Sequence, residues 1–244
     1  MATEFDQPID RSNTSSLKWE KYRNSDVLPM WVADTDFLSP PAISKALHER
    51  VEHGVFGYTN TPEELNTLVI ERMQSLYDWQ IEQDWLIWLP GLVCGLNLAC
   101  RAVGNSNDTV LSPKPIYPPF MSAPRLSDRQ IATVPLQEND GRWTLDLAAL
   151  EAGISSDTKL LLFCNPQNPT GNCWTPDEMR AMGDLCNSKG VLVVADEIHC
   201  DFVNKHATYT PYASLGEQYA QNSVTLKSTS KSFNLAAQHV AYMF

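Results

Sequence analysis

From residue 85 onward, short apolar runs alternate with longer segments of mixed polarity. Each run is four to seven residues long, which suits a buried strand better than a helix. The runs are WLIWL (85–89), TVLS (109–112), IATVPL (131–136), KLLLFC (159–164), GVLVVAD (190–196) and SVTLK (223–227). Helical segments lie between several of them. Strands that alternate with helices predict an α/β fold with a parallel sheet.

The clearest helix is encoded by TPDEMRAMGDLCNSKG. Thr175 is a predicted N-cap, Pro176 takes the first helical position, and Glu178 completes a capping box. Gly190 provides the stop signal. One apolar stripe runs along the segment, made of Met179, Met182, Leu185 and Cys186. We therefore expect a helix with one buried face here.

Residues 1–40 lack this periodicity and are rich in Asp, Ser and Pro. The stretch VLPMWVADTDF within them is too apolar for a free tail. Two helices are expected next, over residues 40–53 and 62–78, joined by the turn-rich loop GVFGYTNTPEE. We therefore expect an N-terminal segment over residues 1–40 and one large α/β domain over residues 41–244.

Charge and composition narrow the classes of partner. The net charge is -11 and no Lys/Arg block is present, which argues against a nucleic-acid or anionic-membrane partner. The first residues have no basic and apolar signal-peptide pattern, and the apolar stretches fall short of the roughly 18–20 residues that span a bilayer. The six cysteines are scattered without a C-x-x-C pair, so we expect reduced thiols in the cytoplasm.

In open α/β sheets, ligands bind beyond the carboxyl ends of the strands. After the first run, Gly91 turns the chain into a helix whose free N–H groups suit a phosphate, although a structural glycine is the commoner explanation. After the second, the stiff loop PKPIYPPF holds Tyr117. Tyr117 either stacks on a flat ligand or covers the sheet edge, and its sequence favours neither.

Two further strand ends carry polar groups. The loop NPQNPTG follows KLLLFC, and its two Asn-Pro steps, with Asn165 and Asn168, are unusual for a purely structural turn. Asp196 ends the run GVLVVAD, where a carboxylate among apolar residues needs a partner. An arginine, a helix N-terminus or the protonated ring nitrogen of a ligand would each serve.

The last run is followed by STSKSFN, with Lys231 among small hydroxyl residues. A partly buried pocket can lower the pKa of a lysine by several units, which makes its amine a nucleophile and a base. The alternative is a solvated surface lysine. The same letters match the S-x-x-K of serine β-lactamases and penicillin-binding proteins, but no S-D-N or K-T-G follows. Taken together, a phosphate-binding turn, a stacking Tyr, an Asn, an Asp for a pyridine nitrogen and a Lys for an aldehyde are the contacts of pyridoxal 5'-phosphate.

The order G-x-x-x-G, P-x-Y, N-P-x-N-P-x-G, D-E-I-H and S-x-S-K-x-F-N-L-A resembles the fold-type I pyridoxal-phosphate enzymes of the aspartate aminotransferase superfamily. More narrowly, the chain is similar to MalY/PatB-type cystathionine β-lyases, the C–S lyases, in the segments SLKWEKY, LPMWVADTDF, VEHGVFGYT, NPQNPTG, VVADEIHCDF and SKSFNLA. The resemblance runs from about residue 10 to the end. It implies a three-layer large domain of the PLP-transferase type with a mostly parallel sheet.

The resemblance also implies roles for the residues at the strand ends. Lys231 would hold the cofactor as a Schiff base, and Asp196 would pair with the pyridine nitrogen. Asn168 would hydrogen-bond the ring hydroxyl and Tyr117 would stack on the ring. His199 stands where many related aminotransferases carry a tyrosine on that hydroxyl, and D-E-I-H is shared with the lyases.

Other residues would bind the phosphate. By resemblance, the backbone N–H groups of Leu92 and Val93 would hold it together with Ser228 or Ser230. Tyr58 resembles the tyrosine that reaches a neighbouring subunit's phosphate, which implies a homodimer with shared sites. Ala33 would lie near the carboxylate of an amino-acid substrate.

The implied reaction is removal of a Cα proton by Lys231 followed by cleavage of the Cβ–S bond, which yields a thiol, pyruvate and ammonia. A class I/II aminotransferase shares the first steps. A non-catalytic or regulatory protein that keeps the fold is the alternative of another class. The segments similar to the C–S lyases favour the lyase reaction.

The end of the chain departs from the family pattern. Ala237 replaces the usual glycine, and His239 stands where many superfamily members place an arginine on the phosphate. Family members continue into a C-terminal small domain with the arginine that binds the substrate carboxylate. That domain is absent from these residues, so we expect a fragment of a longer product rather than a naturally truncated protein.

Overall fold

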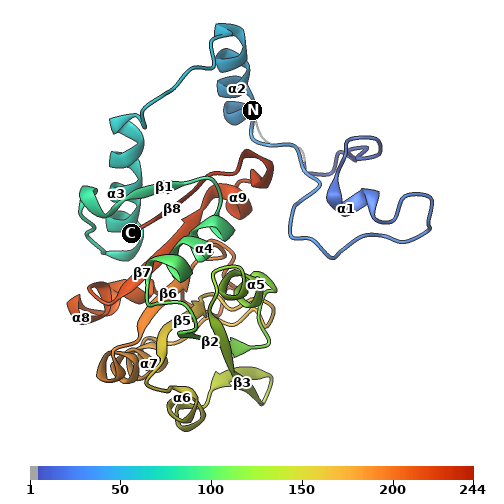
Figure 1. Cartoon of the computed structure of the whole chain (residues 1–244). Coiled ribbons are helices and arrows are strands. Elements are labelled where there is room, and N and C mark those ends of the chain that lie inside the picture. The colour runs from blue at the N-terminus through green and yellow to red at the C-terminus, as the bar shows by residue number, and fades with distance from the viewer. Residues whose placement is uncertain (1–4) are drawn as a thin grey trace. The chain divides into compact units, whose positions relative to one another are not determined.

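Within residues 5–244, which the computed structural model describes, the alternating segments build an eight-stranded sheet in the order β1-β8-β7-β6-β5-β2-β3-β4 (Figure 1). Its strands are β1 (Ile87–Leu89), β2 (Thr109–Lys114), β3 (Gln130–Asn139), β4 (Arg142–Leu145), β5 (Thr158–Cys164), β6 (Leu192–Asp196), β7 (Ser223–Ser228) and β8 (Ala241–Met243). The strands from β3 through β2, β5 and β6 to β7 pair in parallel. The mostly parallel α/β sheet is therefore confirmed.

Three strands at the margins pair antiparallel. β4 pairs with β3, and β8 lies between β7 and β1 and pairs with both. The strand expected over residues 85–89 is shorter, because residues Gln83–Trp85 form a 3-10 helix and β1 begins at Ile87. Strand β4 is not among the strands expected from the apolar runs. Asp140 and Gly141 both have positive φ (51° and 79°), the conformation of a two-residue hairpin turn. The Asp-Gly pair is thus the signal in the sequence that identifies this hairpin.

The helices are α1 (Leu17–Glu20), α2 (Pro41–His53), α3 (Glu63–Tyr77), α4 (Leu92–Ala102), α5 (Pro119–Arg125), α6 (Leu147–Gly153), α7 (Pro176–Lys189), α8 (Glu217–Ala220) and α9 (Thr229–Ser232). The helices expected at 40–53 and 62–78 are α2 and α3. In α7 both hydrogen bonds of the capping box form between Thr175 and Glu178, and Gly190 ends the helix with a φ of 68°. None of the described helices is long and apolar enough to span a membrane.

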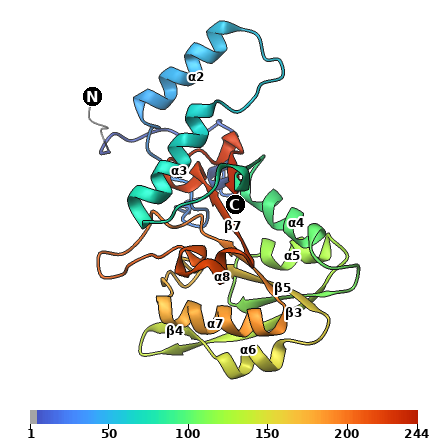
Figure 2. The same cartoon turned by 90° about the vertical axis from the view of Figure 1, so that its left-hand side faces the viewer.

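The sheet is covered on both faces (Figures 1 and 2). Helices α4 and α5 pack on one face, where the buried side chains include Leu96, Phe120, Leu162, Val194 and Leu226. Helices α6 and α7 pack on the other, where they include Leu150, Leu161, Phe163, Met182 and Val193. Successive strand residues thus alternate between two cores, as a sheet buried on both sides requires.

The chain forms two compact units. The sheet unit comprises Thr61–Ser228 and His239–Phe244, and the N-terminal unit comprises Met1–Asn60, described from residue 5, and Thr229–Gln238. The predicted boundary after residue 40 stays a prediction. Residues 1–4 of the predicted N-terminal segment lie outside the described residues. Lys231 belongs to the N-terminal unit, three residues along the chain from the end of β7.

Candidate active site

The carboxyl ends of four parallel strands form one edge of the sheet unit. Strands β2, β5, β6 and β7 are consecutive neighbours there. The backbone N–H of Asn165 donates to the carbonyl of Asp196 at 2.9 Å, so the ladder continues past the end of β5. The loops that carry Tyr117, Asn168 and His199 therefore leave from the same edge, as expected for a ligand site in an open α/β sheet.

Asp196 is the acidic group of this edge. It is only 3% exposed and ends β6, between Cys164 of β5 and Leu226 of β7. Its Oδ1 accepts a hydrogen bond from the Ile198 N–H at 3.1 Å. Because Val194 packs in the core beneath α4 and α5, the strand alternation turns Asp196 to the same face. A carboxylate buried there favours a cationic group beside it.

Helix α4 begins at the same face and its two glycines have different roles. Gly91 is its N-cap with a φ of 110°, a conformation that L side chains rarely adopt. A Cβ on Gly95 would lie 2.8 Å from a methyl of Leu226, so Gly95 lets α4 pack closely against β7. The N–H groups of Leu92 and Val93 are in the first turn and lack intrahelical partners. Such a helix start suits a phosphate.

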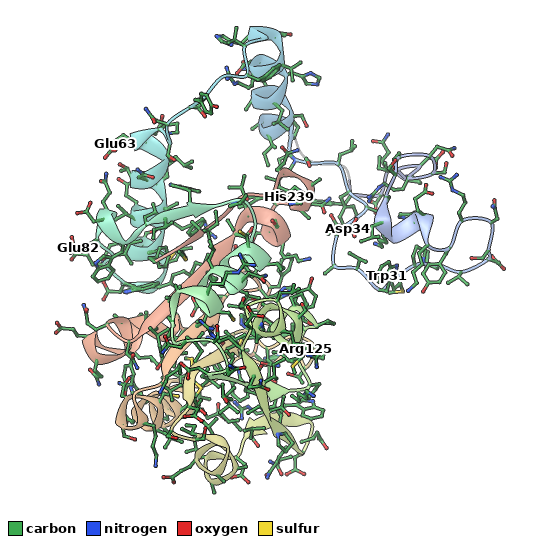
Figure 3. The ribbon with its side chains drawn as sticks, viewed as in Figure 1. Trp31, Asp34, Glu63, Glu82, Arg125 and His239 are labelled. Carbon is green, nitrogen blue, oxygen red and sulfur yellow. The ribbon has the colours of Figure 1, made fainter. Side chains whose placement is uncertain are left out.

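Ser228 and His239 lie in the segments beside this helix start. The Ser228 hydroxyl donates to the Val240 carbonyl at 2.7 Å. His239 Nδ1 is 3.9 Å from the position of a Cβ built on Gly91 (Figure 3). The structure thus brings His239 close to the N-cap of α4.

Tyr117 and Asn168 are on two loops that one side chain joins. Tyr117 is 41% exposed and precedes α5. Gln167, 2% exposed, donates from Nε2 to the Pro115 carbonyl at 2.9 Å and to the Asn168 carbonyl at 3.4 Å. Sequence reasoning did not single out Gln167. A polar residue between two prolines, directly after a buried strand, is the feature that points to it.

His199 lies in the loop after β6. It is half-buried, and its carbonyl accepts a hydrogen bond from the Phe202 N–H at 2.9 Å. The loop therefore turns back within a few residues of Asp196, and it carries the D-E-I-H segment at the sheet edge.

A second lysine lies close to Lys231 in the chain but is already engaged. Lys227, in β7, is 2% exposed, and its Nζ lies 3.2 Å from Glu197 Oε2 and 2.8 Å from the Tyr209 hydroxyl. Lys231 is half-buried in α9. The buried ion pair removes Lys227 from competition for an aldehyde. Sequence reasoning overlooked Lys227 and Glu197, although a charge inside an apolar strand always needs a partner.

In the N-terminal unit, the turn after Lys231 is joined to the segment that carries Ala33. The Thr35 N–H donates to Asn234 Oδ1 at 3.0 Å, and Asn234 Nδ2 donates to the Thr35 carbonyl at 3.1 Å. Asn234 has a φ of 55°. Ala33 itself is exposed and Ser230 is half-buried.

A charged network surrounds Thr35. Asp36 accepts hydrogen bonds from Arg11 at 2.7 Å, Lys18 at 2.7 Å and the Trp19 indole at 2.9 Å. Partial burial by itself would raise the pKa of Asp36, but the hydrogen bonds from Lys18 and Trp19 and the charges of Lys18 and Arg11 hold the pKa below its usual 3.8. The segment Trp31–Asp36 is thus fixed by polar contacts, and Trp31 and Asp34 both belong to it (Figure 3).

Tyr58 follows α2 in the same unit. Its side chain is fully exposed, and Val55 and Phe56 before it are largely exposed. A tyrosine displayed in this way is accessible to a ligand or to another chain.

The family model for aminotransferase class I and II matches residues 25–244. Among curated proteins, the cystathionine beta-lyase PatB of Bacillus subtilis is 39% identical over 237 residues, which cover 95% of this chain and 61% of PatB. Protein MalY of Escherichia coli is 31% identical, with 98% of this chain and 62% of MalY covered. The chain therefore spans less than two thirds of the length of these relatives.

Solved structures have the same fold. Cystalysin from Treponema denticola, whose crystal structure contains a pyridoxal 5'-phosphate cofactor, gives a TM-score of 0.94 at 32% identity over 100% of this chain and 64% of cystalysin. The likeness confirms the predicted three-layer PLP-transferase-like architecture.

Proposed function

The chain belongs to the aminotransferase class I and II family, and from this premise we propose that it is the cofactor-binding part of a pyridoxal-phosphate-dependent C–S β-lyase. Residues 41–244 would form an incomplete large domain, and residues 1–40 an N-terminal segment that contributes to the substrate site. The observation that carries the proposal is the buried carboxylate of Asp196 at the carboxyl edge of the sheet, on the face where α4 begins.

The residues of this edge suit pyridoxal phosphate. Asp196 would hold a proton on the ring nitrogen, because a buried carboxylate favours a cation beside it. Tyr117 would stack on the ring, and Asn168 and His199 would contact the ring hydroxyl. When bound, the cofactor supplies an electron sink for negative charge that develops at the substrate Cα.

The phosphate would lie at the start of α4. Gly91 has no side chain to cap the N–H groups of Leu92 and Val93, and Ser228 lies at the end of β7. Ser230, two residues on, would add a second hydroxyl. Backbone donors and a helix dipole bind a dianion without a fixed positive side chain.

Lys231 would act twice in the reaction. Its amine would first hold the cofactor covalently, and after release it would take the proton from the substrate Cα as a general base. Because Lys227 is held by Glu197 and Tyr209, its amine does not compete. A thiolate would then leave from Cβ, and water would hydrolyse the remaining three-carbon unsaturated amino acid to pyruvate and ammonia.

The substrate would be a cystathionine-like cysteine S-conjugate, since PatB is a cystathionine beta-lyase. Ala33 would lie near its carboxylate. We further propose a homodimer in the cytoplasm, with the exposed Tyr58 reaching the partner's phosphate. Transamination is the second candidate, because the matching family model is described by that activity.

Two measurements test the proposal. The chain is incubated with pyridoxal phosphate and reduced with borohydride, which makes a reversible bond between a lysine amine and the aldehyde permanent. Mass spectrometry of peptides should find the adduct on Lys231, and Lys231→Ala should abolish it. Lys205→Ala, at an exposed lysine, should leave it unchanged. An adduct spread over surface lysines in both variants would refute the proposal that Lys231 binds pyridoxal phosphate.

The reaction is tested separately, with the complete product of the gene. Incubation with cystathionine should release pyruvate without an added keto acid. Turnover that depends on a keto acid and yields no pyruvate would replace the lyase with an aminotransferase. A protein that takes up no cofactor would favour a non-catalytic role.

A further inference from the structure

The buried ion pair between Lys227 and Glu197 has no place in the proposed reaction. Both side chains are almost fully buried, with 2% and 0% exposed, and Nζ lies 3.2 Å from Oε2. The Tyr209 hydroxyl accepts from Lys227 at 2.8 Å and donates to Glu197. The other carboxylate oxygen, Oε1, accepts from the Tyr212 N–H at 2.8 Å. Each charge is therefore paired and hydrogen-bonded.

The pair lies where the ladder between β6 and β7 ends. Asp196 is opposite Leu226 in the last paired position, and the Glu197 N–H donates to the Leu226 carbonyl at 2.9 Å. Glu197 directly follows the last residue of β6, and Lys227 is the residue after Leu226 in β7. Their contact therefore continues the register of the ladder by one further step.

The pair is on the opposite face of the sheet from the proposed cofactor anchors. Val194 and Leu226 pack in the core beneath α4 and α5, so Asp196 and Ser228, each two residues further on, share that face. Glu197 and Lys227 alternate to the other face. Glu197 directly follows Asp196, and Lys227 directly precedes Ser228, so each member of the pair is bonded to one anchor.

Stability alone does not explain such a pair. The cost of desolvating two charges offsets most of their attraction, and apolar replacements of both partners are often neutral or stabilising. Control of the register between β6 and β7 is a better explanation. Backbone hydrogen bonds repeat along the two strands and therefore do not select one register. The ion pair does, because a shift by one residue would turn the side chains to the wrong face and separate the two charges.

We propose that Lys227 and Glu197 are positioning residues that lock the register of β6 and β7, and so set the separation between Asp196 and Ser228. This inference rests on the proposed function, in which Asp196 holds the ring nitrogen and Ser228 the phosphate of one cofactor molecule. Two anchors on neighbouring strands bind one rigid ligand tightly only when their spacing matches it.

The test removes both charges together. In Lys227→Met/Glu197→Gln, the glutamine keeps an acceptor for the Tyr212 N–H, and no buried charge is left unpaired. The matched control is Lys189→Met/Glu151→Gln, the same change at a Lys–Glu pair on the surface, 2.9 Å apart with 40% and 57% of the side chains exposed. Melting temperature is measured for both variants.

The readout compares two ligands. Pyridoxal phosphate engages both anchors, whereas pyridoxal lacks the phosphate and engages only the ring anchor. The buried-pair variant should lose about tenfold in affinity for pyridoxal phosphate and keep its affinity for pyridoxal within about twofold. Its melting temperature should stay close to that of the wild type, and the control should bind both ligands normally.

Other outcomes would refute the proposal that the pair fixes the register of β6 and β7. Unchanged affinity for pyridoxal phosphate, or an equal loss for both ligands together with a lower melting temperature, would make the pair a structural element only. If the double variant does not fold, Glu197→Asp replaces it, because it keeps both charges and shortens one side chain. The same selective loss of affinity for pyridoxal phosphate is expected. Without that loss, the proposed control of strand register is wrong. A wild-type chain that binds neither ligand would instead remove the proposed function, and this inference with it.

Discussion

The sheet unit contains buried apolar clusters on both faces of its sheet, whereas the N-terminal unit is organised by a charged network around Asp36. Helix α2 illustrates the difference, since it is thirteen residues long and has no buried residue, while α4 buries five of its eleven. The proposed cofactor anchors Asp196 and Ser228 are in the sheet unit, and Lys231 is in the N-terminal unit. The sheet unit should therefore be most sensitive to the loss of buried volume, and the N-terminal unit to the loss of a charge or hydrogen bond.

The largest effect is expected from a truncation in the core of the sheet unit. Phe163 is 1% exposed and packs against Trp174, with ring centroids 5.5 Å apart. Phe163→Ala should lower the free energy of unfolding by about 3–5 kcal/mol in urea titrations, because it leaves a cavity. Phe202→Ala, at a phenylalanine that is 55% exposed, should change it by about 0.5 kcal/mol or less. Equal losses would refute the assignment of the core.

In the N-terminal unit the loss of one guanidinium should have a local effect. Arg11 donates hydrogen bonds to Ser16, Asp34, Thr35 and Asp36. Arg11→Met should raise amide hydrogen exchange over residues 31–37 by roughly 10–100-fold, the equivalent of about 1–3 kcal/mol.

The control for this prediction is in the same unit. Arg23→Met removes an arginine whose side chain is 54% exposed and whose partner is Glu20, so exchange should hardly change. Equal exchange in the wild type and Arg11→Met would show that the network does not order the segment.

A smaller effect is expected from the contact between the Lys231 turn and the Ala33 segment. Asn234→Ala removes both hydrogen bonds to Thr35 and should raise amide exchange at Thr35 about tenfold. Asn24→Ala is the control, since Asn24 is exposed and also has a positive φ (64°, against 55° for Asn234). The backbone strain of alanine is therefore similar in both variants. A similar rise in both would mean that strain, not the lost bonds, causes it.

The smallest effect is a titration. The pKa of Asp36 is depressed in the folded chain, so its contribution to stability is present above the usual 3.8 and is lost as the pH falls through the lower folded value. The indole N–H of Trp19, which donates to Asp36 at 2.9 Å, should shift in NMR spectra over that range.

The Trp31 indole serves as the internal reference for this titration. It donates to the Lys18 carbonyl at 3.2 Å, which has no proton to gain. Its resonance should therefore move less than that of Trp19. A Trp19 midpoint above 3.8 would contradict the network.

Much of the sheet unit is predictable from short stretches of sequence. Apolar runs locate the central strands, and the Thr175–Glu178 capping box locates α7, because these signals depend on residues a few positions apart. The strand β4 was missed although the Asp140–Gly141 turn marks it. The strand β8 lies within the apolar stretch HVAYMF, but its pairing with β1 joins segments that are distant in the sequence, so only the fold reveals that pairing.

The candidate site divides in the same way. Its proposed anchors were recognised as motifs, and their roles stay predictions. Gln167, Asn234 and the Lys227–Glu197 pair were not recognised, because each depends on a partner that sequence spacing does not reveal. Thr35 and Asn234, for example, are 199 residues apart.

The sequence by itself determined the order of the elements, the chemistry available at each strand end and the family to which the chain belongs. Period-two alternation, capping and turn residues are local, so they can be recognised without the fold. Only the tertiary structure decided which lysine is buried against Glu197 and which face of the sheet Asp196 and Ser228 share. Those outcomes depend on strand register and burial, which are set by contacts between residues far apart in the chain.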